Sequence, residues 1–449
     1  MLKFFFEPAG LEESVRPRCQ CRLSPTDDSA PRRPFPCPER ELAHGRIPHK
    51  IPSGLWRITS PERKQNRMTS ALSNFARRLR VRIESTMRDA SAPAVTVAGT
   101  PASLFPDDEF DAWALALFAE QFACNPSYHR ICVAAGKTPG TVEHWTQIPT
   151  VPTTAFKEFD LTCLPADKRE VVFHSSGTTR QSPSRHFHHA ESLAVYETSL
   201  WTEFTRRVLP GESEEVADFQ LALLTPPPAQ APHSSLVHMC ETVRRRMGAP
   251  ETSYLGCVHP EGGWTLNYEQ TCSRLAAACM AAQPVLLLGT GFSLVHLLDH
   301  LASRGQRLSL PPGSRVMETG GYKGRSRTLT QAELHALITA RLGVPPAQIV
   351  CEYGMSELSS QAYAAETQTG PREFLFAPWA RARIISPETG QEVRLGETGL
   401  IQVFDLANVF SVMAIQTEDL GVRQAAGFVL AGRAAQAEPR GCSLLPTPP

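Results

Sequence analysis

The chain has 449 residues, which is enough for roughly two or three structural units. Its 45 basic residues balance its 45 acidic ones, so it offers no basic face for nucleic acid, and no nucleic-acid partner is expected. Polar residues interrupt the most apolar stretch, 284–301, and a membrane span needs about 20 mostly apolar residues, so none is expected. No secretory leader is recognisable, which predicts a cytoplasmic protein whose 12 cysteines are reduced thiols.

Residues 1–67 differ from the rest of the chain in composition and in hydrophobic pattern. They are crowded with proline and arginine and show no sustained hydrophobic period, so they predict either a disordered tail or an upstream extension that the natural protein does not carry. Thr69 and Ser70 stand before Ala71 and Leu72, an arrangement typical of a helix start. Residues 68–104 are therefore expected to form a linker with a helical lead-in.

Residues 105–380 alternate between strand-like apolar runs and helical patterns. Such alternation favours an α/β fold with layered sheets and a largely parallel central sheet. The expected strands span residues 170–174, 219–224, 284–289, 315–318 and 348–353, and the expected helices span residues 110–124, 192–208, 234–247, 266–282, 292–304 and 331–342.

Residues 381–449 show shorter apolar runs, at 382–385, 399–405 and 427–431. Turn-forming stretches at 387–390 and 396–399 separate them. This pattern predicts a small β-rich unit that follows the α/β domain and ends in a tail.

A loop of small hydroxylated residues follows the first expected strand. It can bring backbone N–H groups and hydroxyls close to phosphate oxygens, although a polar turn would use the same residues. It is not a P-loop, because no lysine follows the threonines. The loop residues are Ser175, Ser176, Gly177, Thr178 and Thr179.

A second polar cluster follows the expected strand 348–353. It contains Tyr353, Gly354, Ser356 and Glu357. Ligands bind beyond the carboxyl ends of parallel strands in open α/β sheets. At such a place the tyrosine ring can stack on a base and the glutamate can hold Mg²⁺, whereas an ordinary strand exit remains the alternative.

The third cluster pairs an acidic with a basic side chain near the end of the chain. Asp419 lies in the run Thr417–Glu418–Asp419, and Arg433 follows Gly432. A carboxylate at a strand end followed by an arginine suits ribose hydroxyls and a phosphate.

Taken in order, these clusters resemble the motifs of the adenylate-forming superfamily of acyl-, aryl- and luciferase-type ligases. Residues 175–179 resemble its phosphate loop, 353–357 its Tyr-Gly-x-Thr-Glu motif with serine for threonine, and Asp419 and Arg433 its ribose-binding aspartate and hinge arginine. Gly320 and Gly321 fall where that superfamily has a glycine pair beside the adenine. The resemblance implies ATP and Mg²⁺ as cofactors, with Glu357 as the Mg²⁺ ligand.

Within the superfamily the chain looks most like the acyl-protein synthetases of the LuxE type. The stretches Ser184–His186, Ser234–Met239 and Arg440–Ser443 carry this likeness. The chain ends soon after Arg433, as in that family, so the usual large C-terminal lid domain is expected to be absent. The resemblance implies Cys442 as the acyl-accepting nucleophile, whose thiolate form Arg440 would favour.

Some residues depart from the superfamily pattern or stay ambiguous. Arg180 replaces a glycine of the phosphate loop, and with no lid lysine the adenylation step would use Lys323, Arg325 or Arg185. His186, His188 and His189 look like a metal cluster, but alternating histidines on a strand are expected to be solvated, and the family would place His186 beside the site. Cys351 is expected to be a packed core thiol.

The resemblance implies a function and leaves rivals. The expected reaction is ATP-dependent activation of a carboxylic acid to acyl-AMP, followed by acyl transfer to a cysteine thiol. The leucine-rich stretch 285–298 indicates an apolar, fatty acid, and an acyl-reductase or carrier protein is the expected partner. The alternatives are an AMP-forming acyl- or aryl-CoA ligase and a catalytically weak scaffold of an acyl-reductase complex. The chain length of the acid and the oligomeric state stay open.

Overall fold

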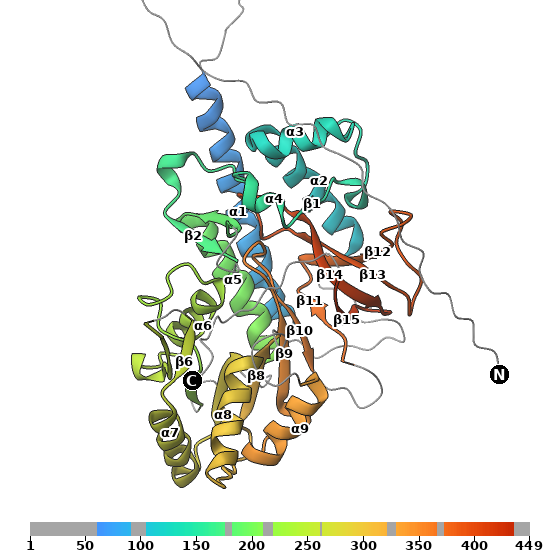
Figure 1. Ribbon diagram of the computed structural model, residues 1–449. Helices are drawn as coiled ribbons and strands as arrows, with labels where there is room; N and C mark the ends of the chain where they lie inside the picture. Colours follow the sequence, from blue (N-terminus) through green and yellow to red (C-terminus); the bar gives the residue numbers. More distant parts are fainter. Residues whose placement is uncertain are drawn as a thin grey trace, which may run out of the picture. The chain divides into compact units, whose positions relative to one another are not determined.

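The structure is a computed structural model that describes residues 61–90, 105–175, 182–209, 219–260, 263–320, 329–365 and 372–434. The structural unit that contains all of them spans Thr59–Pro449. Two β-sheets and the helices packed on them make up most of the described residues (Figure 1). They confirm the predicted layered α/β class.

The larger sheet has six strands. In spatial order these are β11 (Leu375–Phe376), β10 (Ala362–Ala365), β9 (Ile349–Tyr353), β8 (Arg315–Thr319), β7 (Val285–Thr290) and β4 (Gln220–Leu223). The last four run parallel to one another, whereas β10 runs antiparallel to both of its neighbours, β9 and β11. Every residue of β7 is buried, which is usual for a parallel strand covered on both faces. The four parallel strands were predicted, and the antiparallel edge was not.

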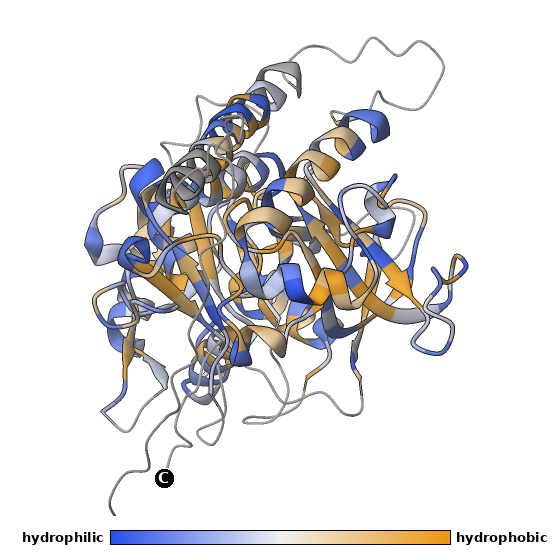
Figure 2. Ribbon diagram, turned by 90° about the horizontal axis from the view of Figure 1, so that it is seen from above, coloured by the Kyte–Doolittle hydropathy of each residue, from blue (hydrophilic) through white to orange (hydrophobic). Residues whose placement is uncertain are grey.

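Helices cover both faces of this sheet (Figure 1). They are α5 (Ala190–Arg207), α6 (Ser235–Arg246), α7 (Tyr268–Ala281), α8 (Gly291–Ser303) and α9 (Gln331–Leu342). Alternate residues of each strand point to opposite faces. Leu287 therefore joins α7, α8 and α9 in one apolar cluster, and Leu286 joins α5 and α6 in another. The apolar strands lie inside and much of the hydrophilic sequence lies on the helices (Figure 2).

The second sheet contains the predicted β-rich segments. Its strands are β12 (Ala380–Ile385), β13 (Thr398–Asp405), β14 (Ala414–Arg423) and β15 (Phe428–Arg433), joined by β1 (Val151–Pro152), which pairs in parallel with β14. The extent of β14 was not predicted, because polar residues interrupt it, and Asp419, expected at a strand end, lies in the interior of this strand. Since β1 comes from much earlier in the chain, the domain boundary expected at 380/381 stays a prediction.

Smaller elements surround the two sheets. They are the hairpins β2 (Val171–His174) with β3 (Arg185–His188) and β5 (Gly256–Val258) with β6 (Trp264–Leu266), the helices α2 (Asp107–Cys124), α3 (Pro126–Ala134) and α4 (Ala155–Glu158), and 3-10 turns at Trp145–Gln147, Ala166–Lys168, Glu251–Ser253 and Pro346–Gln348. Leu266, expected in a helix, ends β6, because the Asn267 side chain accepts from the Gln270 N–H and starts α7 there.

The helix expected to begin near Thr69 is longer than predicted. Helix α1 (Pro61–Ala90) begins before that position, since the charged residues 61–68 lack an apolar period but have good helix propensity. Its apolar stripe, which includes Leu72, Phe75 and Leu79, is buried. The Ser73 hydroxyl donates to Glu191 on α5 at 2.6 Å, so the helix packs on the α/β layer.

The expectation that every cysteine is a reduced thiol is wrong. Cys124, at the end of α2, forms a disulfide with Cys163, and their Cα atoms lie 5.1 Å apart. The Cys163 N–H donates to the Phe410 carbonyl at 2.8 Å, and Gln121 of α2 donates to the carbonyls of Asn408 and Val409, so one loop holds both segments together. The spacing of 39 residues gave no indication of this contact. In the part of the chain that is described, no helix is both long and apolar enough for a membrane crossing.

Candidate active site

A cavity of about 310 Å³ lies at the carboxyl ends of β8 and β9, where ligands bind in open α/β sheets. The residues lining it come from all three predicted clusters and from the glycine-pair segment. From those segments the lining residues are Ser175, Thr319, Gly320, Tyr353, Gly354, Ser356, Glu357, Asp419, Gly432 and Arg433. The fold thus brings together segments that are far apart in the sequence.

The phosphate-loop segment reaches the cavity through its first residue. The Ser175 N–H donates to the Ser184 hydroxyl at 3.2 Å, and the Ser184 N–H donates to the Ser175 hydroxyl at 3.0 Å. These two bonds close the base of the loop. The predicted residues Ser176, Gly177, Thr178 and Thr179, like Gly321 and Cys442, lie outside the described residues.

The loop 353–357 touches both other clusters. The Ser356 hydroxyl lies 3.3 Å from that of Ser184 at the base of the phosphate loop, and it donates to Glu357 Oε2 at 2.9 Å. Glu357 is fully buried, and its carbonyl accepts a bond of 2.9 Å from the Asn408 amide. A side chain at Gly354 would meet the Glu352 carboxylate, so a larger residue would require this buried side chain to shift.

Asp419 and Arg433 form a pair on the second sheet. They are cross-strand neighbours on β14 and β15, and Arg433 Nε donates to Asp419 Oδ1 at 2.9 Å. The Tyr353 hydroxyl donates to Asp419 Oδ2 at 3.0 Å, which ties the end of β9 to this sheet. Arg433 also contacts Glu418 at 3.1 Å. A ribose bound here would meet a carboxylate already held in place on both of its oxygens.

The prediction that the strand histidines are solvated is wrong for two of them. His186 and His188 project from the same face of β3 and are buried there, because Phe156 packs against His186 and Tyr196 of α5 packs against His188. His186 Nδ1 donates to the Ser356 carbonyl at 2.8 Å. Burial lowers the pKa of His186 to about 4, against the opposing effects of Ser356 and Glu357. A neutral His186 therefore holds the loop 353–357 through its bond to Ser356, without lining the cavity itself.

Arg185 lies away from the cavity. Strand alternation points it opposite to His186, and its guanidinium forms an ion pair of 2.9 Å with Asp160. It is not among the residues that line the cavity. Its catalytic role stays a prediction that this geometry does not favour, and Lys323 and Arg325 lie outside the described residues.

The apolar lining does not come from the stretch that was expected to supply it. Leucines of 285–298, such as Leu287 on β7 and Leu294 on α8, pack in the apolar core between the sheet and its helices. The apolar side chains at the cavity are instead Leu236, Met239, Met355, Phe374 and Leu430. The leucine-rich run forms the buried strand β7 and the helix α8 that follows it.

Two supporting residues were missed from the sequence. Asp405, at the end of β13, accepts four hydrogen bonds from Ser359, Ser360 and Ala407. Asn408 donates to the Glu357 carbonyl and, at 3.1 Å, to that of Val412. Both hold the loop after Tyr353, and their contacts join segments about 45 to 51 residues apart, which no local pattern reveals.

The layered fold, with a cavity between the parallel strand ends and the second sheet, is that of adenylate-forming enzymes. A crystal structure of 2-hydroxyisobutyryl-CoA ligase in an open conformation, with 2-HIB-AMP and CoA, is similar at a TM-score of 0.53 and 13% identity. The match covers 74% of this chain and 75% of that one. The same ligase in the thioesterification state matches at 0.52 and 13% identity, over 73% and 68% of the two chains.

The family follows from the sequence. The family model "Acyl-protein synthetase, LuxE" matches residues 106–446, so the chain belongs to the LuxE acyl-protein synthetase family. A comparison with curated proteins gives no significant match. The protein is an AMP-forming acid–thiol ligase: it uses ATP to activate a carboxylic acid as acyl-AMP and transfers the acyl group to a thiol.

Proposed function

We propose that this one cavity holds the acyl-adenylate, with each sequence motif at a different part of the nucleotide. Ser175 and the loop 176–179 surround the phosphate, Gly320 and Tyr353 flank the adenine together with Gly321, and Asp419 binds the ribose with Arg433 beside it. The observation that carries this proposal is that Ser175, Glu357 and Asp419 line a single cavity although they lie on separate segments.

Glu357 is the proposed Mg²⁺ ligand. Its carboxylate lines the cavity beside Ser356, whose hydroxyl reaches the base of the phosphate loop. Carboxylate oxygens next to substrate phosphates are the ligands that Mg²⁺ prefers in nucleotide sites, so the residues fit the ion. When bound, Mg²⁺ neutralises charge on the phosphates of ATP.

The acid is proposed to carry an apolar, fatty acyl chain. Leu236 and Met239 of α6 and Met355 line the cavity, and methionine adapts to flexible apolar ligands. In the described lining no lysine or arginine other than Arg433 is present, so a second carboxylate on the substrate would find little charge compensation.

The acceptor is proposed to be Cys442. In this step the thiolate sulfur attacks the acyl carbon, a C–S bond forms, the C–O bond to AMP breaks and AMP leaves with the electron pair. The acyl group would then pass to an acyl-reductase or carrier partner.

Exchange of labelled pyrophosphate into ATP, dependent on added acid, tests the adenylation site. Wild-type protein should exchange with long-chain acids, and Asp419→Asn should lose most of this activity. Glu392→Gln is a matched control in the connection between β12 and β13, because Glu392 pairs with Arg383 and Arg423 outside the cavity lining. Failure of exchange with every acid from acetate to palmitate would refute the proposal.

The thiol acceptor is tested separately. Cys442→Ser should abolish acylation of the protein while pyrophosphate exchange continues. If acylation of coenzyme A replaced self-acylation in wild-type protein, the proposed acceptor would be wrong and the ligase would be of the CoA type.

A further inference from the structure

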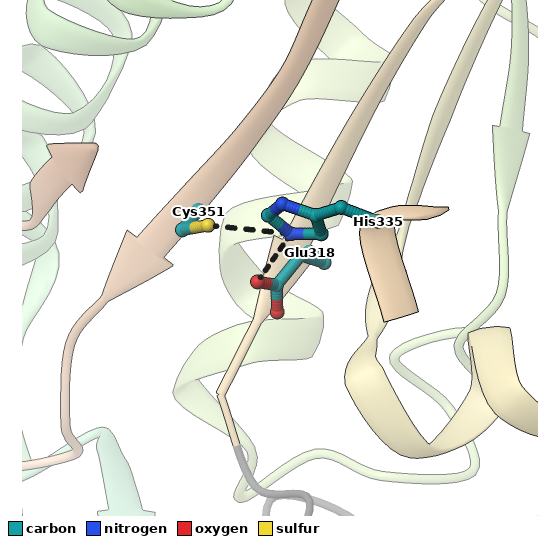
Figure 3. Close-up of side chains that lie close together, drawn as sticks. All are labelled: Glu318, His335 and Cys351. Carbon is teal, nitrogen blue, oxygen red and sulfur yellow. Dashed lines mark hydrogen bonds and ion pairs between the residues drawn. The ribbon is translucent and has the colours of Figure 1, made fainter. Parts of the chain in front are cut away.

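Three side chains that commonly bind metals meet beside the cavity (Figure 3). Glu318 lies on β8, His335 on α9 and Cys351 on β9. One ligand atom from each lies within 4.8 Å of the other two. The three residues are only 0%, 5% and 1% exposed, respectively. Buried groups of this kind are paired or bind an ion, so their meeting needs an explanation.

The fold holds these side chains in place through its backbone. Glu318 and Cys351 are direct partners in the parallel β8–β9 register, so their side chains project from the same face of the sheet. Helix α9 packs on that face through Leu334 and Ile338. Its first turn is fixed by a capping box between Thr330 and Glu333, which sets the position of His335.

A catalytic relay does not explain the arrangement. His335 Nε2 lies 3.3 Å from Glu318 Oε1 and 3.6 Å from Cys351 Sγ, so both neighbours face the same ring nitrogen. A Cys–His–Glu relay would use one ring nitrogen for each partner. Protons on Nε2 and on the thiol can join the trio through hydrogen bonds to Glu318, but a cation binds all three groups at once.

The thiol is also unsuited to be a free nucleophile. Burial, together with the nearby Glu318 carboxylate, raises the pKa of Cys351 far above its ordinary range. Without a bound metal ion Cys351 is therefore a neutral thiol, although the Arg372 guanidinium lies nearby and opposes this effect in part. A bound metal ion would deprotonate it, since a coordinating thiol loses its proton.

The distances agree with coordination of one ion. Zinc binds nitrogen at about 2.0–2.1 Å, sulfur at about 2.3 Å and carboxylate oxygen at about 2.0–2.2 Å, in tetrahedral geometry. Such geometry separates a nitrogen from an oxygen by about 3.3 Å and a nitrogen from a sulfur by about 3.6 Å. The structure shows 3.3 Å and 3.6 Å for these pairs.

We propose that Glu318, His335 and Cys351 bind a zinc ion. Thiolate and imidazole ligands select zinc over Mg²⁺ and Ca²⁺, which prefer oxygen. This site is thus distinct from the Mg²⁺ ligand Glu357. Arg372, whose Nη1 lies 3.8 Å from Cys351 Sγ, further favours the thiolate.

Gln331 lies between the cluster and the cavity. The Gln331 amide nitrogen lies 2.7 Å from Cys351 Sγ and 3.2 Å from Glu318 Oε1, so it closes this side of the cluster. Gln331, Glu318 and Cys351 all line the cavity. If zinc binds, the Gln331 amide oxygen or a water molecule would supply the fourth ligand. The ion would join the ends of β8 and β9, from which Gly320 and Tyr353 reach the proposed nucleotide.

Cobalt provides a spectroscopic test that is independent of adenylation. The full-length protein is stripped with a chelator and titrated with Co²⁺. One Co²⁺ should bind per chain, with a sulfur-to-cobalt charge-transfer band and a tetrahedral visible spectrum, and Zn²⁺ should displace it. Loss of a residue that only supports a metal ligand weakens metal binding by up to about 100-fold. Cys351→Ala and His335→Gln remove a ligand itself, so each should weaken binding by more than about 100-fold.

Two further variants keep the test decisive. Cys351→Asp should still bind Co²⁺ but without the charge-transfer band. Retained binding would show that the variant is folded, and the missing band would show that the sulfur ligand is lost. Cys240→Ser removes another buried thiol, one on α6 outside the cluster, and should leave the spectrum unchanged. Absence of stoichiometric Co²⁺ binding to wild-type protein, or an unchanged spectrum in Cys351→Ala, would overturn the proposal.

Discussion

Replacing Asp405 should destabilise the protein strongly although the residue touches no ligand. Its buried carboxylate accepts bonds from Ser359 N–H (2.9 Å), Ser360 N–H (2.8 Å), the Ser360 hydroxyl (2.7 Å) and Ala407 N–H (2.9 Å). No lysine or arginine takes part in these contacts. The carboxylate thus acts as a cap for the loop that follows Glu357.

The magnitude follows from these bonds. Each buried donor left without a partner costs about 1–3 kcal/mol, so the four in Asp405→Ala together cost at least about 4 kcal/mol. Burial of the carboxylate has its own cost, which raises the pKa of Asp405 and offsets part of that loss. The expected net loss is about 3–4 kcal/mol. Asp405→Asn keeps the shape and one acceptor, so its loss should be about half as large.

Urea unfolding followed by tryptophan fluorescence measures this loss, and pyrophosphate exchange measures its effect on the site. The unfolding free energy and the rate of pyrophosphate exchange should both fall in the order wild type, Asp405→Asn, Asp405→Ala. Asp107→Ala is the control, because Asp107 makes an exposed ion pair with Arg381 that should contribute less than about 1 kcal/mol. An Asp405→Ala protein within about 1 kcal/mol of wild type would refute this reasoning.

Three further predictions concern the nucleotide site, a buried histidine and the disulfide. Asp419→Asn should raise the KM for ATP by at least about tenfold, since a hydrogen bond to a charged group contributes about 1.5–3 kcal/mol. An unchanged KM in pyrophosphate exchange would contradict the ribose role. The pKa of His186 is lowered by burial from 6.5 to about 4, so its contribution to stability is complete above pH 6.5 and is lost as the pH falls through 4. The wild-type unfolding free energy should therefore drop by roughly 3 kcal/mol more than that of His186→Gln over this window, and equal slopes would argue against a buried neutral ring. Cys163→Ser should lower the unfolding free energy by about 4 kcal/mol, because the bond with Cys124 closes a loop of 39 residues. Equal thermal midpoints of wild type and Cys163→Ser in non-reducing buffer would show that the bond contributes nothing.

The sequence predicted elements whose periodicity is strong. The apolar run that became β7 and the helical spacing that became α9 are both set by local hydrophobic pattern, and the structure has them close to the predicted bounds. Tyr353 and Asp419 were also recognised, because they belong to motifs with a fixed order. The structure adds that they bond to each other.

Other features depend on contacts between distant segments. Asp405 gives no local indication that it caps a loop about 45 residues away, and the run Arg185–His188 does not show by itself that its histidine face is the buried one. The pairing of Glu318 with Cys351 arises only from the strand register. Tertiary packing therefore decides which of these polar side chains are buried.

Intact mass spectrometry tests the central claim most directly. The protein is incubated with ATP, Mg²⁺ and a panel of acids from acetate to palmitate. We expect a mass increase that matches an acyl group for the long-chain acids, requires ATP, and disappears in Asp419→Asn and in Cys442→Ser. No acyl adduct with any acid, or one that forms equally well in Asp419→Asn, would contradict a single cavity that makes the adenylate and delivers it to a protein thiol.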